Sequence, residues 1–194
     1  MGKEIVRSYH LAKELAQLFD LESNIDTVLA VSMIKLNLFM NSERSSIFLF
    51  DPLKQQLTTF SSLDLEKQEF KFSKSVGVAG WVFENLKSAI VNDAYNDNRF
   101  YREIDDLTGF RTRNLICTPL IDYKENCFGT LQSLNKKGGD FTSEDLELLD
   151  LTASLIAVAI NNSRRYSEAM ITNEARKKLV KNIMKNMGNP PDFK

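Results

Sequence analysis

The chain has 194 residues, of which 43% are apolar and 26% are charged, and its net charge is −1 with a pI near 5.9. This composition is ordinary for a globular domain with a well-filled core, and it excludes a disordered or fibrous chain. The near-zero net charge argues against nucleic-acid binding, because phosphates would find no summed positive field to neutralise them.

Two further features of the composition bear on the cell compartment. No apolar run reaches the roughly 18 residues that a membrane span needs, and the N-terminus lacks the apolar core of a signal peptide. Cys117 and Cys127 lie in apolar segments and are too few for a disulfide framework, which favours buried thiols in a reducing compartment. We therefore expect a cytoplasmic protein, and we expect no membrane contact by these 194 residues.

The N-terminal part of the chain predicts two helices. Residues 3–20 carry leucines and alanines at helical spacing, interleaved with polar residues, which is typical of an amphipathic helix. A second helix is predicted from Ile25 to about Met40, with a capping residue in Ser23-Asn24 and an end at Asn41-Ser42.

Six strands are predicted next, with two short helices inserted among them. Residues 45–50 are apolar on both faces, as expected for a central strand covered on two sides. Strands over 57–63 and 70–72, joined by the polar SLDLEKQE connection, continue it as a meander. The other predicted elements are a helix over 77–86, a strand over 89–91, a loop over 92–98, a helix over 100–107 closed by Gly109, and strands over 115–121 and 127–134.

A last helix is predicted from Thr142 to about Asn186. At about 1.5 Å per residue its roughly 45 residues would extend 65 to 70 Å, whereas a domain of about 150 residues is only roughly 40 Å across. We therefore expect the helix to leave its own domain. Spacings of three and four, typical of a heptad-like seam, link Leu146, Leu149, Ala153, Ile156 and Ile160.

The middle of the chain has the composition of a pocket for a compact anion. Such a pocket needs backbone donors at a helix start, short polar side chains and apolar walls. The amides of Val78 and Ala79 would begin a helix and could donate to a phosphate. Asp105, Thr108 and Thr112 lie at spacings of three and four, so they would point the same way, toward a lid over the pocket.

Three strings in this order are shared with one family: GVAG at 77–80, DAYNDNRFYREIDDLTGFRTRN at 93–114 and NKKGGDF at 135–141. With the element order, they make residues 8–165 similar to the GAF domains of cyclic-nucleotide phosphodiesterases and bacterial adenylyl cyclases. The family signature NK(x)F(x)3DE is matched through Asp145, but Leu146 replaces its final acid. The resemblance implies an α+β GAF fold: a mainly antiparallel six-stranded sheet, helices on both sides and a long C-terminal helix.

The same resemblance implies a ligand and the residues that hold it. The ligand is cAMP or cGMP, with cAMP slightly favoured, and no cofactor or metal is implied. The phosphate would lie at the helix start that the GVAG string forms, and Phe60 is the nearest aromatic for stacking on the base. The positions that match ligand contacts are Ser46, Phe60, Val78, Ala79, Asp105, Thr108, Thr112 and Gln132.

Several of these residues also have a structural explanation. Thr108 and Thr112 are of a type that caps helices or lies in solvated loops. Asp105 would pair at the surface with Arg111 or Arg113, a contact worth little. We assign Asn135, Lys136 and Asp145 to structure outright, because a lysine at the end of a strand can pair with an aspartate in the first turn of the next helix.

The sequence predicts no catalytic residue. The sole histidine, His10, lies on the first helix, so neither a Ser-His-Asp triad nor a histidine metal site can form inside the fold. A methionine sulfoxide reductase of GAF type needs several redox cysteines, and a bilin photoreceptor typically has a reactive cysteine followed by histidine, whereas Cys117 is followed by Thr118.

We therefore expect an N-terminal helix at 1–22 as a linker or dimer contact, a GAF domain at 23–162, and a helical linker at 163–194 to a downstream module. The predicted function is a cyclic-nucleotide sensor in a larger cyclase or phosphodiesterase, signalling through the terminal helices of a homodimer. The alternative is a ligand-free GAF domain that serves as a dimerising spacer. Small polar residues at the pocket positions favour the sensor, because a filled core would use larger apolar side chains.

Overall fold

The structure is a computed structural model that describes residues 2–22, 24–62 and 70–186. Residues 63–69 of the predicted SLDLEKQE connection lie outside the described residues. Two compact units are formed, Met1–Ala159 and Ile160–Lys194. The first unit is an α+β domain, as the sequence predicted, and the second is helical.

The two N-terminal helices match their predicted ranges. They are α1 (Gly2–Leu21) and α2 (Ile25–Met40). The Asn24 side chain caps α2 by accepting a hydrogen bond from the Thr27 amide at 3.1 Å. Leu11 and Leu15 of α1 are no more than 1% exposed, and α1 packs on α2 inside the first compact unit.

One antiparallel sheet of six strands organises the first unit, with the order β3-β2-β1-β6-β5-β4. The first three strands form the predicted meander, and the two strands that close the sheet lie on the other side of β1. The bounds are β1 (Ser42–Asp51), β2 (Gln56–Ser62), β3 (Lys71–Ser73), β4 (Ala89–Val91), β5 (Leu115–Ile121) and β6 (Cys127–Lys136).

The two central strands are longer than the sequence predicted. β1 begins at Ser42, three positions before the predicted start, and β6 continues to Lys136. Ser42 pairs with Lys136, and Arg44 pairs with Leu134, so each extension supplies the hydrogen-bonding partner of the other. Pairing between segments about 90 residues apart leaves no local sequence signal, which is why both ends were missed.

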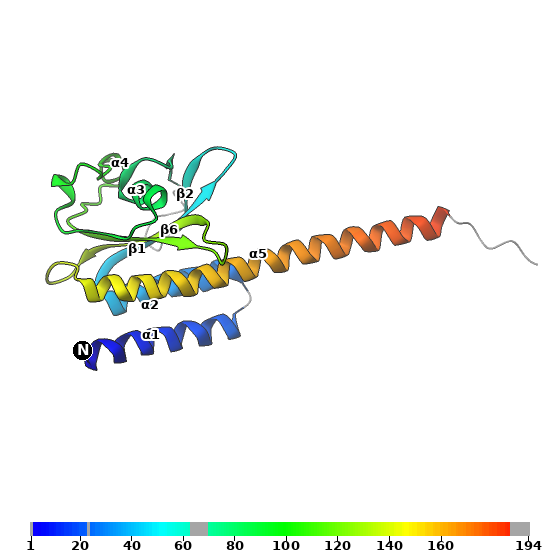
Figure 1. The fold of residues 1–194 in the computed structure, drawn as a ribbon, viewed down its shortest axis with the longest axis horizontal. Coiled ribbons are helices and arrows are strands. Elements are labelled where there is room, and N and C mark those ends of the chain that lie inside the picture. Colours follow the sequence, from blue (N-terminus) through cyan, green and yellow to red (C-terminus); the bar gives the residue numbers. More distant parts are fainter. Residues whose placement is uncertain (1, 23, 63–69, 187–194) are drawn as a thin grey trace, which may run out of the picture. The chain divides into compact units, whose positions relative to one another are not determined.

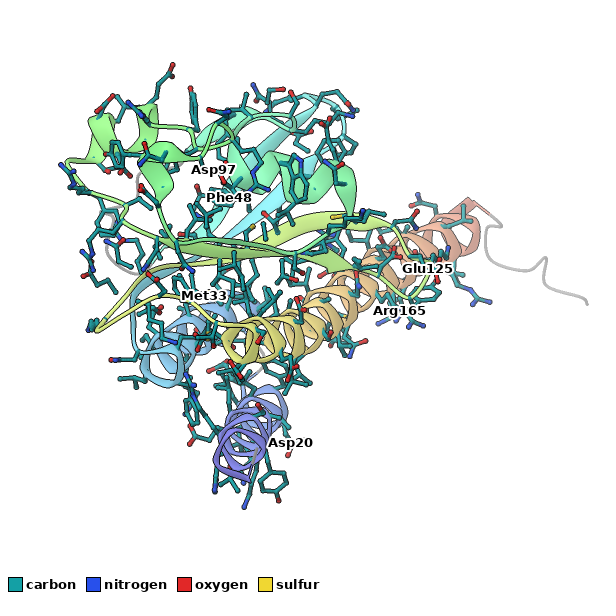
Figure 2. The ribbon with its side chains drawn as sticks, turned by 60° about the vertical axis from the view of Figure 1, so that its left-hand side comes forward. Asp20, Met33, Phe48, Asp97, Glu125 and Arg165 are labelled. Carbon is teal, nitrogen blue, oxygen red and sulfur yellow. The ribbon has the colours of Figure 1, made fainter. Side chains whose placement is uncertain are left out.

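Helices cover both faces of the sheet, so there are two buried layers. α1, α2 and the first part of α5 lie on one face, and α3 (Gly77–Asn85) and α4 (Glu103–Thr108) lie on the other (Figure 1). Figure 2 shows Met33 among the helices of the first face and Phe48 on the opposite side of the sheet. Both side chains are buried, and the second layer is the one that holds the cavity described below.

The segment before α4 differs in detail from the prediction. A short 3-10 helix, η1 (Ala94–Asn96), lies in the expected loop, and α4 begins three residues later than predicted. The carboxylate of Asp97 accepts a hydrogen bond from the Arg99 amide at 2.8 Å, and the Phe100 amide donates to the Asp97 carbonyl at 3.0 Å. This turn keeps the chain out of the helix until Arg102.

The last helix, α5 (Ser143–Asn186), has the predicted length. Leu149, Ala153 and Ile156 are no more than 3% exposed and lie within the first unit, so they fill the domain's own core instead of a seam with a second helix. In the second unit, by contrast, Tyr166 is 69% exposed and Ile171 is 70% exposed. Within the described ranges, α5 and the other helices are too short or too polar to cross a membrane.

Candidate functional site

A cavity of about 70 Å³ lies between the sheet and the segment that we call the lid, residues 92–112. Its floor comes from β1, β5 and β6, and its walls come from β2, β3 and the start of α3. All the predicted site residues whose side chains the structure describes line it. The lining residues are Arg44, Ser46, Phe48, Thr59, Phe70, Phe72, Gly77, Val78, Ala79, Phe100, Tyr101, Ile104, Asp105, Thr108, Phe110, Thr112, Leu115, Gln132 and Leu134.

Phe60, the predicted stacking residue, lies in β2, but its side chain is outside the described part of the structure. The pairing of β1 with β2 shifts register next to it: Phe48 pairs with Thr59, whereas Ile47 pairs with Ser61. A residue passed over at such an irregularity cannot be assigned to a face by counting alternate positions. Among the described side chains of this region, Thr59 and Phe70 line the cavity.

The floor of the cavity carries two polar side chains side by side. Ser46 of β1 and Gln132 of β6 are directly opposite each other in the strand register, so both point to the cavity face. Ser46 is 5% exposed. Among the described residues, neither the Ser46 hydroxyl nor the Gln132 side-chain amide forms a hydrogen bond. The floor therefore offers hydrogen-bonding groups that the described part of the protein does not use.

The start of α3 forms one wall, and it also has unused donors. Val78 and Ala79 lie in the first turn of α3 and line the cavity. The N-cap residue of α3 is Val76, whose side chain makes no capping hydrogen bond. The first backbone amides of α3 therefore receive no side-chain acceptor from the N-cap. Contact between these amides and a ligand stays a prediction.

The second glycine of the GVAG string has a packing role. A methyl group on Gly80 would lie 2.7 Å from the carbonyl oxygen of Lys74, which is backbone of the turn before α3. Only glycine lets the helix approach that turn so closely. Gly80 therefore serves the packing of the chain on itself.

Asp105 is the centre of the lid's own hydrogen bonds. Its side chain is 5% exposed and accepts hydrogen bonds from the Thr112 amide at 2.6 Å, the Thr112 hydroxyl at 2.7 Å and the Tyr95 hydroxyl at 3.0 Å. Desolvation and then the hydrogen bond to Asp105 raise the pKa of Tyr95, so its hydroxyl stays a donor at neutral pH. The lid is thus closed on itself at its C-terminal end.

The surface pairing considered for Asp105 is not found. Arg113 pairs instead with Glu43 at 2.8 Å, and the guanidinium carbon of Arg111 lies 5.2 Å from the ring centre of Tyr95. Asp105 is buried, whereas both arginines are exposed. The predicted convergence of Asp105 with Thr112 on one side of the lid does occur.

Thr108 lines the cavity but also completes the end of α4. Its hydroxyl donates to the Ile104 carbonyl at 2.8 Å and accepts a hydrogen bond from the Phe110 amide at 3.2 Å. The structural explanation of this residue as a helix-end group is therefore confirmed, while its place at the cavity leaves a ligand contact open to test.

Sequence reasoning missed several residues of the cavity, above all Arg44, Tyr101 and Phe110. The guanidinium carbon of Arg44 lies 4.2 Å from the ring centre of Phe110, a cation–π contact between the floor and the lid. Arg44 precedes Ser46 by two positions on the same strand, so alternation would have found it. The lid aromatics had no such signal, because the path of an irregular segment depends on tertiary contacts.

The residues assigned to structure do connect the last strand to the last helix. Lys136 donates to the Asp145 carboxylate, as predicted, and Arg7 of α1 approaches the same carboxylate at 3.6 Å. The Thr142 amide donates to it at 3.0 Å. Asp145 is 1% exposed, so this ion pair is buried and joins β6, α1 and the first turn of α5.

Asn135 holds the exit of the lid. Its Nδ2 donates to the Arg111 carbonyl at 2.8 Å, and its Oδ1 accepts from the Arg113 amide at 2.7 Å. One side chain of β6 therefore fixes the backbone on both sides of Thr112. The C-terminal end of the lid is tied to the sheet as well as to Asp105.

Neither cysteine belongs to the cavity. Cys117 is fully buried in the core next to it, and burial raises the pKa of its thiol well above the usual range. Burial also raises the pKa of Cys127. Among the described residues that line the cavity there is no cysteine or histidine, and no cluster of metal-binding side chains occurs in the described ranges.

Comparisons with known proteins match most of the chain. A family model described as GAF domain matches residues 24–160. The chain is 27% identical over 186 residues to dual 3′,5′-cyclic-AMP and -GMP phosphodiesterase 11 of Drosophila melanogaster, covering 87% of this chain but 12% of that protein. It is 27% identical over 170 residues to dual 3′,5′-cyclic-AMP and -GMP phosphodiesterase 11A of Takifugu rubripes, covering 81% of this chain and 18% of that protein. This chain therefore spans only a small part of each relative.

A solved structure supports the fold. The GAF domain of a phosphoenolpyruvate-protein phosphotransferase from Coxiella burnetii has a TM-score of 0.75 at 16% identity, over 84% of this chain and 98% of that chain. At this identity the likeness concerns the fold alone. It extends to a six-stranded antiparallel sheet with helices on both faces.

Proposed function

Because this chain belongs to the GAF domain family, we propose that it binds a cyclic nucleotide, cAMP or cGMP, in the cavity under the lid. It is a regulatory domain and not a catalytic one, and it is similar to segments of cyclic-nucleotide phosphodiesterases. The sequence resemblance slightly favours cAMP, and the proposal includes no cofactor or metal. Both purines remain to be tested.

Two adjacent polar side chains on the cavity floor support this proposal most. Ser46 and Gln132 face the cavity and have no hydrogen-bonding partner among the described residues. A ligand with matching donors and acceptors would satisfy these groups, and each hydrogen bond formed would be worth about 0.5 to 1.5 kcal/mol. The edge of a purine offers such groups, and the amides of Val78 and Ala79 offer donors for the phosphate.

The closed lid sets a condition on binding. The cavity of about 70 Å³ is smaller than the roughly 300 to 1,000 Å³ of ordinary ligand pockets. A nucleotide therefore requires the lid, residues 92–112, to move outward or its side chains to turn away. A ligand that binds one of two lid positions more tightly would shift the equilibrium between them toward that position, because only differential affinity can do so. This shift would be the signal that the domain passes on.

The alternative function is a ligand-free GAF domain that acts as a dimerising spacer. The hydrogen bonds of Asp105 with Thr112 and Tyr95 favour it, because they satisfy the lid's polar groups without any ligand. The small size of the cavity favours it as well. Thermal unfolding in the presence of nucleotides separates the two functions.

We expect cAMP or cGMP, but not the corresponding 5′-monophosphates, to raise the melting temperature of the protein. A ligand at 100 times its dissociation constant stabilises by about 2.7 kcal/mol, which for a chain of this size is roughly 5 to 10 °C. Gln132→Leu should weaken binding of that ligand about fivefold, since it removes one hydrogen bond worth about 1 kcal/mol. Its own melting temperature without ligand should be unchanged.

Gln56→Leu is the matched control, because Gln56 lies on β2 and does not line the cavity. It should bind like the unaltered protein. A flat melting response to both cyclic nucleotides at millimolar concentration, in protein shown by mass spectrometry to carry no copurified ligand, would favour the spacer and end the sensor proposal.

We propose in addition that the chain forms a homodimer through its terminal helices and acts on a downstream cyclase or phosphodiesterase module in the cytoplasm. Support comes from apolar side chains of the second compact unit, which are exposed along α5. They include Tyr166, Met170, Ile171, Leu179 and Val180, which are between 45% and 70% exposed. A second copy of the same helix would cover such residues.

Removal of residues 163–194 should weaken self-association at least tenfold in sedimentation velocity, because these exposed apolar residues lie in that part of α5. A full-length variant with Tyr166→Ser and Ile171→Ser should behave in the same way, and it keeps the chain length constant. Equal association of all three proteins would mean that α5 beyond residue 162 does not hold a dimer.

A further inference from the structure

A second, outer space lies beside the cavity. It is an open groove of about 380 Å³ bounded by residues 75–77 and 98–101 together with Trp81 and Glu84. Gly77, Phe100 and Tyr101 line both the groove and the inner cavity. These three residues therefore separate the groove from the inner cavity.

This wall is thin where Tyr101 meets Gly77. The Cβ of Tyr101 would be 3.4 Å from a methyl group placed on Gly77, so the tyrosine rests on backbone with no side chain between them. Gly77 has φ +77°, a conformation that favours glycine. Tyr101 is half-buried, with its ring 6.3 Å from that of Phe72. A turn of this one side chain would join the two spaces.

The contact between the lid and α3 contains no hydrogen bond among the described residues. The polar bonds of this part of the lid stay within it: Arg99 pairs with Asp97 at 2.6 Å, and the Tyr101 hydroxyl donates to Glu103. Asp97 lies on the same side of the sheet as Phe48 (Figure 2). Toward α3, the polar contact among the described residues is that of the Arg99 guanidinium, whose carbon lies 4.6 Å from the ring centre of Trp81. We call this contact between the lid and α3 the seam. Opening the seam would break only apolar and cation–π contacts among the described residues.

The opposite end of the lid is held far more firmly. Asp105 accepts three hydrogen bonds there, two of them from Thr112, and Asn135 fixes the backbone on either side of Thr112. Hydrogen bonds to a carboxylate, such as those that Asp105 accepts, are stronger than bonds between neutral groups. The lid therefore has a tied end at Thr112 and a free edge at Tyr101.

From this asymmetry we infer that the nucleotide enters and leaves the cavity through the seam between Gly77 and Tyr101, with the outer groove as its entrance. The inference rests on the proposed function. The residues Trp81 and Tyr101 line the groove, so a purine would meet these aromatic residues before the cavity floor. Glu84 lines the groove but not the cavity, so it belongs to the entrance and not to the binding site.

An obstacle in the groove tests the route without touching the site. Glu84→Cys in a Cys127→Ser background, labelled with a biotin maleimide, should slow both association and dissociation at least tenfold. The dissociation constant should stay within about threefold, because an obstacle on the path changes the barrier and not the end states. Leu107→Cys with the same label is the control, since Leu107 is 69% exposed on α4 and lines neither space.

The measurements use cAMP and cGMP. Isothermal calorimetry gives affinity, the fluorescence of Trp81 gives association because it is the sole tryptophan, and release of tritiated nucleotide gives dissociation. Tyr101→Ala should speed association and dissociation together. Identical rates for the two labelled proteins would overturn the route and leave the proposed function standing, as would a weaker affinity with unchanged association. No binding by the unlabelled, unaltered protein would overturn both.

Discussion

Lys136→Met is expected to lower the free energy of unfolding by about 3 to 5 kcal/mol, the usual cost of breaking a buried ion pair from one side. Asp145 is 1% exposed, and it loses the cationic partner that donates to its carboxylate when Lys136 is replaced. Arg7 remains at 3.6 Å but is itself 33% exposed, so it compensates the carboxylate only in part. Methionine keeps most of the side-chain volume, so the loss reports charge and hydrogen bonding and not a cavity.

Urea unfolding followed by circular dichroism measures this change. Lys137→Met is the matched control, because Lys137 is the next residue, has the same charge and is exposed. It should change stability by less than about 0.5 kcal/mol. If both variants unfold at the same urea concentration, the ion pair with Asp145 does not stabilise the junction of β6 with α5.

Asp105→Ala is expected to lower the free energy of unfolding by about 3 kcal/mol in the absence of any ligand. The substitution leaves the Thr112 amide and hydroxyl and the Tyr95 hydroxyl without their acceptor. Hydrogen bonds to a charged group are worth about 1.5 to 3 kcal/mol each, and water that enters the loosened lid recovers part of the sum. Amide hydrogen exchange should show faster exchange over residues 92–112.

Asp106→Ala provides the comparison, because Asp106 carries the same charge on the same helix and is exposed. Asp105→Ala should also weaken the cyclic nucleotide, through faster dissociation from a lid that closes poorly. The two roles of Asp105 can be told apart. If it only contacts ligand, Asp105→Ala will be as stable as Asp106→Ala while its affinity falls, and the lid-closing role is then wrong.

Local structure could be predicted from the sequence to a large extent. The ranges of α2, β4 and β5 were predicted as they are found, and the pairing of Lys136 with Asp145 was expected from their places at a strand end and a helix start. Each of these depends on short-range periodicity or on neighbours close in the chain. The start of β1 was missed because it depends on pairing with β6, which is remote in the sequence. The start of α4 was missed because the turn at Asp97 delays the helix.

The polar residues of the cavity could also be predicted from the sequence, but their different roles could not. Ser46, Asp105, Thr112 and Gln132 all looked alike as small or polar side chains at pocket positions, and all line the cavity. In the structure, the Thr112 hydroxyl donates a hydrogen bond to Asp105, whereas the side chains of Ser46 and Gln132 form no hydrogen bond with the described residues.

By itself, then, the sequence determined the order and type of the elements and the set of residues around the cavity. Tertiary structure alone decided which of those residues hydrogen-bond to other residues of the protein. It also decided the size of the cavity under the lid and which edge of the lid is free. The physical reason is that a hydrogen bond needs its partner within about 3 Å. Tyr95 reaches Asp105, and Asn135 reaches the backbone beside Thr112, only after the sheet and lid have packed together.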